Sequence, residues 1–388
     1  MLDPAIIHLN HGSFGSCPRP VLDYQWSLRE RLEKNAMQFL VRELEGMLDS
    51  ARAALADFVG ANPENLVFVP NATTGVNAVL RSLAWAPGDE LLTTNQVYNA
   101  CGNALDFAAA RHGARVVVVD VPFPLDDGQQ IVDAVRTGIN AHTRLALLDH
   151  VTSETGIILP IEQLVPLLQE RGIEVLIDGA HAPGMVNLDL ESLGADYYTG
   201  NCHKWICAPK GAGFLHVKPE KQAVIRPLAI SHGANSSRTD RSRFQIEFAW
   251  TGTADPTAYL SVPEALRVVA TRHPDGWPGL IRANHERVVE GRRVLCCALG
   301  VEIPCPEAML GSLASIPLPE AATSEPSLSP LALDALQDQL FYTHGIEAPV
   351  FPWPQAPNRL LRVSSQDYNV PDDYRKLADA VRGMGLVK

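Results

Sequence analysis

The stretch Ile173-Glu174-Val175-Leu176-Ile177-Asp178-Gly179-Ala180-His181 joins a run of apolar residues to an acidic residue and a Gly-Ala pair. A short apolar run bounded by polar residues is typical of a strand that helices cover on both faces. In open α/β sheets, ligands bind just beyond the carboxyl ends of the strands. Asp178 therefore stands where a ligand would bind. The ordinary alternative is an aspartate that caps a helix or closes a turn.

Outward from this strand, apolar runs alternate with helical patterns. The pattern predicts strands at 66–69, 90–93, 115–119, 145–148 and 174–177, and helices at 75–83, 100–110 and 161–170. Strands that alternate with helices indicate a mostly parallel α/β sheet.

After residue 255 the pattern changes. It predicts helices at 256–271, 279–299 and 371–384, a loop at 317–330, and a short strand at 360–364. Four prolines between 349 and 357 exclude a central strand there. We therefore expect residues 21–255 to form a large α/β domain and residues 256–388 a smaller C-terminal α/β domain. Residues 1–20 would be an N-terminal segment that joins the active site and the small domain.

Charge, hydropathy and cysteine content exclude several kinds of binding partner and cellular location. The net charge of -12 argues against nucleic acid and against an anionic membrane surface. The N-terminus lacks the basic start and apolar stretch of a secretory signal, and no run approaches the roughly 20 apolar residues of a membrane span. Seven cysteines without a CxxC pair suggest neither disulfides nor a metal site. We expect a cytoplasmic protein with no metal.

A lysine follows a second short apolar stretch, 195–199. Lys204 stands between His203 and Trp205, close to the glycine-rich turn 209–213. A lysine in a loop is ordinarily a solvated surface charge. A catalytic lysine must become neutral, and at its usual pKa of about 10.4 almost none is neutral at pH 7. Burial or a neighbouring positive charge would lower the pKa and create a nucleophile.

The segment Pro70-Asn71-Ala72-Thr73-Thr74-Gly75 lies between a predicted strand and a predicted helix. Free backbone N–H groups and the dipole at such a helix N-terminus favour a phosphate. The segment lacks the GxxxxGK[ST] pattern of a nucleotide-binding loop. Ordinary helix capping is the alternative explanation.

Together these three features are the fixtures that pyridoxal 5'-phosphate (PLP) needs: a phosphate cradle, an acid for the pyridine nitrogen and a lysine for the aldehyde. The chain resembles the class V aminotransferase superfamily of fold-type I PLP enzymes, and within it the isopenicillin N epimerase-like branch. Leu9-Asn10-His11-Gly12-Ser13-Phe14-Gly15 matches the N-terminal signature of that branch. The resemblance runs from about Asn10 to Asn369.

The resemblance implies a role for each matching residue. Lys204 would hold PLP as a Schiff base, Asp178 would keep the pyridine nitrogen protonated, and His181 would lie near the ring hydroxyl. The cofactor contacts implied in addition are Ala72, Thr73, Thr74, Tyr98, Ser153, Asn201 and His203. Tyr98 would stack on the ring, where many relatives have His or Phe. Ser153 stands at a position where desulfurases have an asparagine.

Two further segments concern the substrate and the partner. The segment Trp250-Thr251-Gly252-Thr253 resembles one whose threonine reaches the phosphate of the neighbouring subunit, which implies a homodimer with shared sites. Arg362 stands where the family clamps the substrate carboxylate, and its planar fork suits bidentate binding. Asn10 and His11 would line the same pocket for an amino-acid substrate.

Several reactions stay open from the sequence. Epimerisation, transamination and β-elimination by a C–S lyase all begin with removal of the Cα proton, a task for Lys204. We favour an isopenicillin N epimerase-like enzyme, with a C–S lyase as the alternative. Cysteine desulfurase activity is not expected, because no cysteine follows Cys305, and Cys296 and Cys297 should be buried in a helix. A non-catalytic binding protein of the same fold would be expected to lack Lys204, Asp178 or Arg362.

Overall fold

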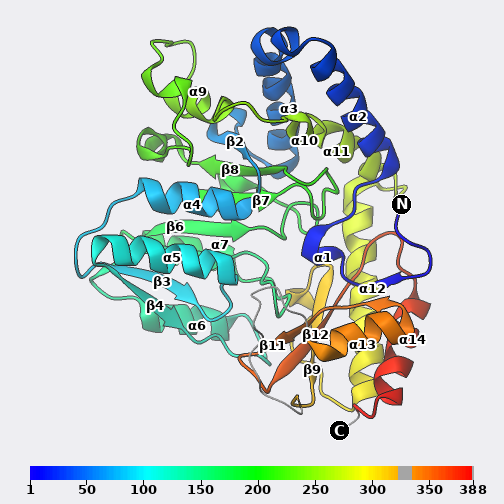
Figure 1. Ribbon diagram of the computed structural model, residues 1–388. Helices are drawn as coiled ribbons and strands as arrows, with labels where there is room; N and C mark the ends of the chain where they lie inside the picture. Colours follow the sequence, from blue (N-terminus) through cyan, green and yellow to red (C-terminus); the bar gives the residue numbers. More distant parts are fainter. Residues whose placement is uncertain (322–333, 387–388) are drawn as a thin grey trace.

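The computed structural model describes residues 1–321 and 334–386. Its main feature is a seven-stranded sheet with the strand order β2-β8-β7-β6-β5-β3-β4 (Figure 1). The strands are β2 (Leu66–Val69), β3 (Glu90–Thr94), β4 (Arg115–Val119), β5 (Thr143–Asp149), β6 (Glu174–Gly179), β7 (Tyr197–Asn201) and β8 (Gly213–Val217). Only β8 runs antiparallel to its neighbours, β2 and β7. The sheet confirms the predicted mostly parallel α/β fold.

Helices cover both faces of this sheet. Helices α4 (Ala72–Ser82) and α5 (Asn99–His112) lie on one face, and α6 (Gln129–Gly138) and α7 (Ile161–Gln169) lie on the other. Leu147 and Leu176 belong to the core under α4 and α5, whereas the next residues, Leu148 and Ile177, belong to the core under α6 and α7. Successive side chains of a strand point to opposite faces, so a sheet that is covered twice needs continuous apolar runs.

A second, three-stranded antiparallel sheet forms near the C-terminus, with the order β11-β12-β9. Its strands are β9 (Leu313–Leu318), β11 (Val350–Pro352) and β12 (Arg359–Ser364). The long helix α12 (Gly276–Leu299) packs against β9, β12 and α14 (Pro371–Gly383), and α13 (Ala335–His344) contacts β10 (Ile346–Glu347). This smaller α/β unit matches the predicted fold class.

The helices that follow residue 256 contact the beginning of the chain. α10 (Thr257–Leu260) and α11 (Val262–Ala270) contact α2 (Arg19–Lys34) and α3 (Leu44–Val59). A domain boundary near residue 255 therefore stays a prediction.

The N-terminal segment runs between the two sheets (Figure 1). β1 (Ile7–His8) pairs in parallel with β10, and the backbone N–H of Ser364 donates to the carbonyl of Leu9 at 2.8 Å. The short helix α1 (His11–Phe14) follows directly and lies beside the end of the large sheet. The first fifteen residues thus reach the small sheet and the large sheet together.

Most predicted elements coincide with observed ones. The strands predicted at 66–69 and 115–119 match β2 and β4 residue for residue, and the proline-rich stretch 349–357 contributes only the edge strand β11. The loop predicted at 317–330 overlaps the end of β9 and lies outside the described residues from 322 to 330. Across the described ranges, no helix combines the length and apolarity that a membrane span requires.

Candidate active site

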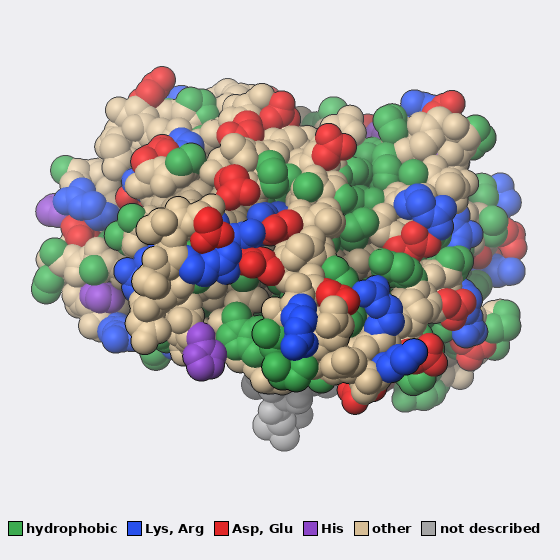
Figure 2. Space-filling view, turned by 90° about the horizontal axis from the view of Figure 1, so that it is seen from above, with side chains coloured by type: hydrophobic (Ala, Val, Ile, Leu, Met, Phe, Trp, Pro, Cys, Tyr) green, Lys and Arg blue, Asp and Glu red, His purple; other side chains and the backbone are tan. Residues whose placement is uncertain are grey.

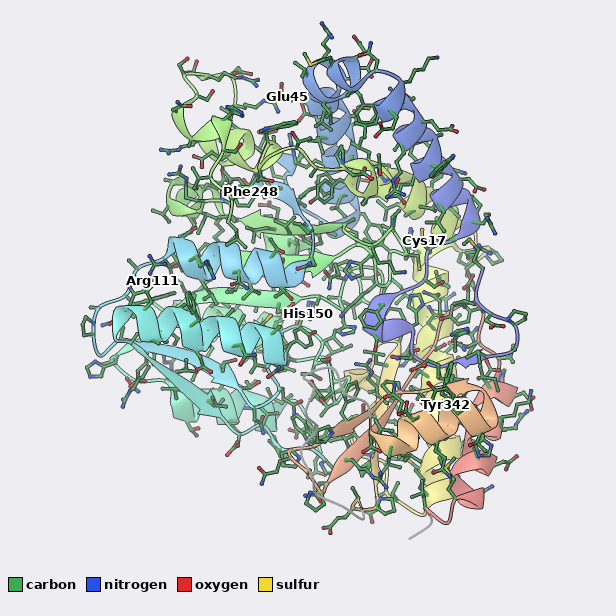
Figure 3. The ribbon with its side chains drawn as sticks, in the orientation of Figure 1. Cys17, Glu45, Arg111, His150, Phe248 and Tyr342 are labelled. Atoms are coloured by element: carbon green, nitrogen blue, oxygen red, sulfur yellow. The ribbon has the colours of Figure 1, made fainter. Side chains whose placement is uncertain are left out.

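The residues singled out from the sequence converge at one end of the large sheet. Asp178 lies near the carboxyl end of β6, Asn201 ends β7, and Lys204 follows three residues later. Asp149 ends the neighbouring strand β5, and Figure 3 labels the following residue, His150, at the end of the sheet that faces α1. Because parallel strands have their carboxyl ends at one edge, side chains far apart in the sequence meet there.

The amine of Lys204 lies against an imidazole. Lys204 Nζ is 3.0 Å from His181 Nε2, and the indole N–H of Trp205 donates to His181 Nδ1 at 3.4 Å. The proton of a neutral His181 ring is therefore on Nε2, where it faces a lone pair of the Lys204 amine. Burial holds the pKa of His181 well below its usual range. Burial and the charge of Arg362 lower the pKa of Lys204 to about 8, which favours the neutral, reactive amine.

His11 holds the peptide of Lys204. If its Nε2–H donates to the Lys204 carbonyl at 3.1 Å, Nδ1 is free to accept from the hydroxyl of Tyr368, also at 3.1 Å. Burial lowers the pKa of His11 to about 4, so this neutral form persists at physiological pH. Gly15 has a φ of +69°, and a Cβ at that position would lie 2.0 Å from the carbonyl oxygen of His203. The hydrogen bond of His11 to the Lys204 carbonyl and the close approach of Gly15 to His203 hold the N-terminal segment against the Lys204 loop.

The N-terminus of α4 forms the second corner of the site. Asn71 Oδ1 accepts the backbone N–H of Thr74 at 2.9 Å, and Asn201 Oδ1 accepts that of Ala72, also at 2.9 Å. Within the described residues, the backbone N–H of Thr73 has no acceptor. A helix N-terminus with a free N–H favours an anionic group such as a phosphate.

Asp178 forms the third corner. Its Oδ1 accepts the backbone N–H of Ala180 at 2.9 Å, and its Oδ2 accepts the thiol of Cys101 at 3.0 Å. Burial raises the pKa of Asp178, while the thiol, the Ala180 N–H and the charge of Lys204 act in the opposite direction. Each carboxylate oxygen can accept a further hydrogen bond. Asp178 can therefore pair with a protonated ring nitrogen.

Arg362 of β12 is a buried cation, with 2% of its surface exposed. Its guanidinium donates to the Ser153 carbonyl at 2.5 Å, to Ser13 Oγ at 3.0 Å and to Asn10 Oδ1 at 3.3 Å. Burial lowers the pKa of Arg362 to about 10, and the nearby charge of Glu154 opposes that effect. In the part of the chain that the structure describes, no carboxylate forms an ion pair with it. A buried cation with a planar fork, and without a direct ion pair among the described residues, suits the carboxylate of a ligand.

Comparisons with known proteins agree with this geometry. Residues 24–271 match the model of the family "Aminotransferase class-V". The chain belongs to the class V aminotransferase family.

Two relatives of this member of the class V aminotransferase family match nearly its whole length. It is 34% identical to an isopenicillin N epimerase of Amycolatopsis lactamdurans, over 98% of this chain and 96% of the relative. It is 31% identical to a probable chloroplastic L-cysteine desulfhydrase of Arabidopsis thaliana, over 98% of this chain and 83% of the relative. The fold resembles that of the cystine C–S lyase C-DES, with a TM-score of 0.78 over 97% of each chain at 22% identity.

This member of the class V aminotransferase family is a PLP-dependent enzyme, and its residues fit the cofactor. The amine of Lys204, whose pKa is lowered to about 8, is available for an aldehyde, and Asp178 is available for a pyridine nitrogen. The N–H of Thr73, which has no acceptor among the described residues, is a donor for a phosphate. The donor set is thus complementary to the three functional groups of PLP.

Some predicted site residues are not joined to this constellation. Tyr98 is 41% exposed and Thr253 is also exposed, and among the described residues neither side chain forms a hydrogen bond with the others. Ser153 contributes its backbone carbonyl to Arg362, and His203 Nδ1 lies 3.2 Å from the carbonyl of Ala212. The roles of these residues stay predictions.

One expectation was wrong, and three residues were missed. Cys297 is exposed, because it occupies the solvent face of α12, whereas Cys296 beside it is buried as predicted. Sequence reasoning assigned no role to Cys101, Asp149 or Glu154. Asp149 ends an apolar run just as Asp178 does, so the same signal could have found it. The contact of Cys101 with Asp178 joins two elements 77 residues apart, and no local pattern indicates it.

Proposed function

We propose that this PLP enzyme removes the Cα proton of an amino acid, with Lys204 as the base and Arg362 as the ligand of the substrate carboxylate. The observation that carries the proposal is a buried Arg362 without a direct ion pair among the described residues, in the same site as a lysine of lowered pKa. The neutral amine of Lys204 accepts the Cα proton. His181 limits the positions that this amine can take, because His181 is itself held by Trp205.

PLP supplies an electron sink for the substrate carbanion when it is bound. In this proposal Asp178 keeps the ring nitrogen protonated, and the N-terminus of α4 binds the phosphate. Asn201 orients the first turn of α4 through the N–H of Ala72. His11 fixes the carbonyl of Lys204, so the lysine side chain starts from a defined position.

Epimerisation is the reaction we propose first, and β-elimination at a C–S bond is the second candidate. Similarity to the isopenicillin N epimerase supports the first, and similarity to the L-cysteine desulfhydrase supports the second. Persulfide formation is not proposed. Cys297, the one exposed cysteine, lies within the regular helix α12, and the other six cysteines are buried.

We also propose a homodimer in which Thr253 serves the phosphate site of the partner subunit. Trp250, Thr251 and Gly252 border an apolar hollow of about 250 Å³ between α3 and α9 (Arg243–Ala249), and Thr74 of α4 borders it too. The side of the molecule with α3 and α9 is the one seen in Figure 2, where hydrophobic side chains lie among charged ones. A second copy that covers this side would bring its own loop near α4.

The decisive experiment is a screen of L- and D-amino acids, including L-cysteine, in heavy water. It follows deuterium at Cα, keto acid and sulfide together. Deuterium exchange with inversion and without keto acid supports the epimerase, and sulfide with pyruvate supports the lyase. A keto acid formed together with an aminated cofactor indicates transamination. A full panel without exchange at Cα, in a protein that retains the visible absorbance of bound PLP, would reject the proposal.

A further inference from the structure

Three ionisable side chains meet behind the part of the site that we assign to the ring nitrogen. Asp149 ends β5, Asp178 lies near the end of β6, and Cys101 lies in the first turn of α5. Each aspartate has 3% of its surface exposed, and Cys101 has none. Water is therefore largely excluded from these groups.

The contacts within this cluster are unequal. Asp149 and Asp178 are direct neighbours in the register of β5 and β6. Asp178 accepts two hydrogen bonds, from the thiol of Cys101 at 3.0 Å and from the N–H of Ala180 at 2.9 Å. By contrast, Asp149 Oδ2 is buried without a hydrogen-bond partner among the described residues.

Two adjacent buried carboxyl groups cannot both carry a charge at neutral pH, so they titrate as a pair. Backbone N–H groups, including that of Tyr98, also favour the anion of Asp149, but one of its oxygens, Oδ2, has no partner among the described residues. Both oxygens of Asp178 accept a hydrogen bond, so Asp178 is the better site for the anion. Asp149 then carries the proton. Burial and the charge of Asp178 raise the pKa of Asp149 well above its usual range, in agreement with this assignment.

We propose that Cys101 is a positioning residue for the cofactor: its thiol keeps Asp178 the anionic member of the Asp149–Asp178 pair and orients the oxygen that meets the ring nitrogen. This inference rests on the proposed role of Asp178. Loss of the thiol leaves Asp178 more basic, so that Asp178 competes more strongly for the proton of the ring nitrogen. The ring then withdraws electrons less strongly, and the nitrogen of Lys204 that is bound to it becomes more basic.

Other groups also act on Asp178 and must stay constant in the test. The titratable side chains that face Asp178 from the surrounding elements are Tyr98, Cys101, Asp149, Tyr198 and Lys204. Only the first three lie on the side of α5 and β5. Single variants at Cys101 and Asp149 change the pair and leave Tyr98, Tyr198 and Lys204 in place. Glu154, whose charge raises the pKa of Asp149, also stays in place.

The test measures the pH midpoint of the visible absorbance of the PLP-loaded enzyme. Loss of one hydrogen bond to a charged acceptor shifts the pKa of Asp178 by about one unit, and only part of that shift is transmitted through the ring. Cys101→Ala should therefore raise the midpoint by roughly half a pH unit. Cys101→Ser keeps a hydrogen-bond donor at this position, so its midpoint should equal that of the wild type. Asp149→Asn replaces a group that is already neutral and should leave the midpoint nearly unchanged. Cys296→Ala removes a buried thiol from α12 and is the matched control.

An unchanged midpoint in Cys101→Ala, or a shift in Cys101→Ser equal to that in Cys101→Ala, would overturn the inference. A large shift in Asp149→Asn would place the charge on Asp149 and overturn it as well. Cys101→Val fills the volume of the thiol without a donor and replaces the alanine variant if that one does not fold. The midpoint needs no substrate, so failure of the amino-acid screen would reject the proposed function and leave this result standing.

Discussion

At the scale of single residues, a variant of Arg362 tests whether substrate binding can be separated from cofactor chemistry. Arg362→Ala removes a cation that has no carboxylate partner among the described residues, so its main loss should appear when a substrate carboxylate arrives. A charge-assisted bidentate pair is worth roughly 2–5 kcal/mol, which predicts a loss in kcat/KM on the order of 30-fold or more. The absorbance of bound PLP should not change. Steady-state kinetics and a visible spectrum of the same sample check both statements.

A matched variant sharpens this prediction. Asp178→Asn keeps the volume of the side chain and the Arg362 site, and it should damage kcat and alter the cofactor spectrum. If Arg362→Ala leaves kcat/KM intact, or changes the spectrum as Asp178→Asn does, the carboxylate site lies elsewhere.

Lys204 should leave a signature in the stability of the apoprotein. Its pKa is lowered from 10.5 to about 8 in the folded chain. The unfolded chain therefore binds the proton more readily across that window, and this group raises the free energy of unfolding as pH increases from 8 to 10.5. Below pH 8 the cost of burying the ammonium is fully present.

Lys204→Met removes that cost. The variant should be more stable than the wild-type apoprotein at pH 7, and its advantage should shrink by about 3 kcal/mol between pH 8 and pH 10.5. Urea unfolding of both proteins across this range measures the difference, in which the titration of the other residues largely cancels. A difference that is independent of pH would mean that the Lys204 amine is not desolvated.

At the scale of elements, the contact between α4 and β7 positions the N-terminus of α4, which is the proposed phosphate site. A Cβ on Gly75 would lie 2.1 Å from Thr199 Oγ1. Gly75→Ala should therefore push α4 away from the sheet, destabilise the protein by about 1–3 kcal/mol and weaken PLP binding. Gly46 of α3 is the control, because nothing lies within 4 Å of a Cβ there.

Gly46→Ala should stabilise the protein by about 0.5–1 kcal/mol, since alanine favours a helix over glycine. Thermal unfolding and a PLP titration of both variants provide the comparison. Equal PLP affinity in Gly75→Ala and wild type would mean that the phosphate does not bind at the first turn of α4.

Element patterns also explain how far the sequence could be interpreted. The strands β5 and β6 were predictable, because burial on both faces leaves continuous apolar runs. The shared location of Asp178 and Lys204 at one edge of the sheet was predictable, because such strands lead to both residues. Their roles stay predictions. Helix α12 was harder to interpret. Apolar residues are spread along its sequence, and the pattern did not indicate which side of the helix faces solvent, so Cys297 was wrongly predicted to be buried. The thiol–carboxylate contact of Cys101 depends on how α5 packs on β6, which no sequence window contains.

At the scale of the whole molecule, the N-terminal segment connects the two halves of the site. His11 bonds to the Lys204 carbonyl, and its own N–H donates to Ser364 Oγ of β12 at 2.7 Å. Two residues before Ser364, Arg362 lies in the same strand. The proposed base and the proposed carboxylate site are thus joined through one short segment, although 158 positions separate them in the sequence.

The proposed homodimer can be tested by complementation between two inactive variants. In Lys204→Ala the base is lost, and in Thr253→Asp a carboxylate on the exposed loop would repel the phosphate. If Thr253 serves the partner subunit, a mixed dimer has one site with both Lys204 and Thr253 intact. Random exchange of equal amounts gives mixed dimers in about half of the population, and hence about a quarter of the wild-type sites.

The experiment mixes the two variants under conditions that exchange subunits and then measures activity and covalent PLP after borohydride reduction. Each variant alone should stay inactive. If Thr253 acted within its own chain, every site in the mixed dimer would carry one of the two defects, so no activity would return. Recovery of activity therefore requires that the chain forms a dimer and that the loop with Thr253 reaches the active site of the partner subunit. The exposure of Thr253 in one chain demonstrates neither point.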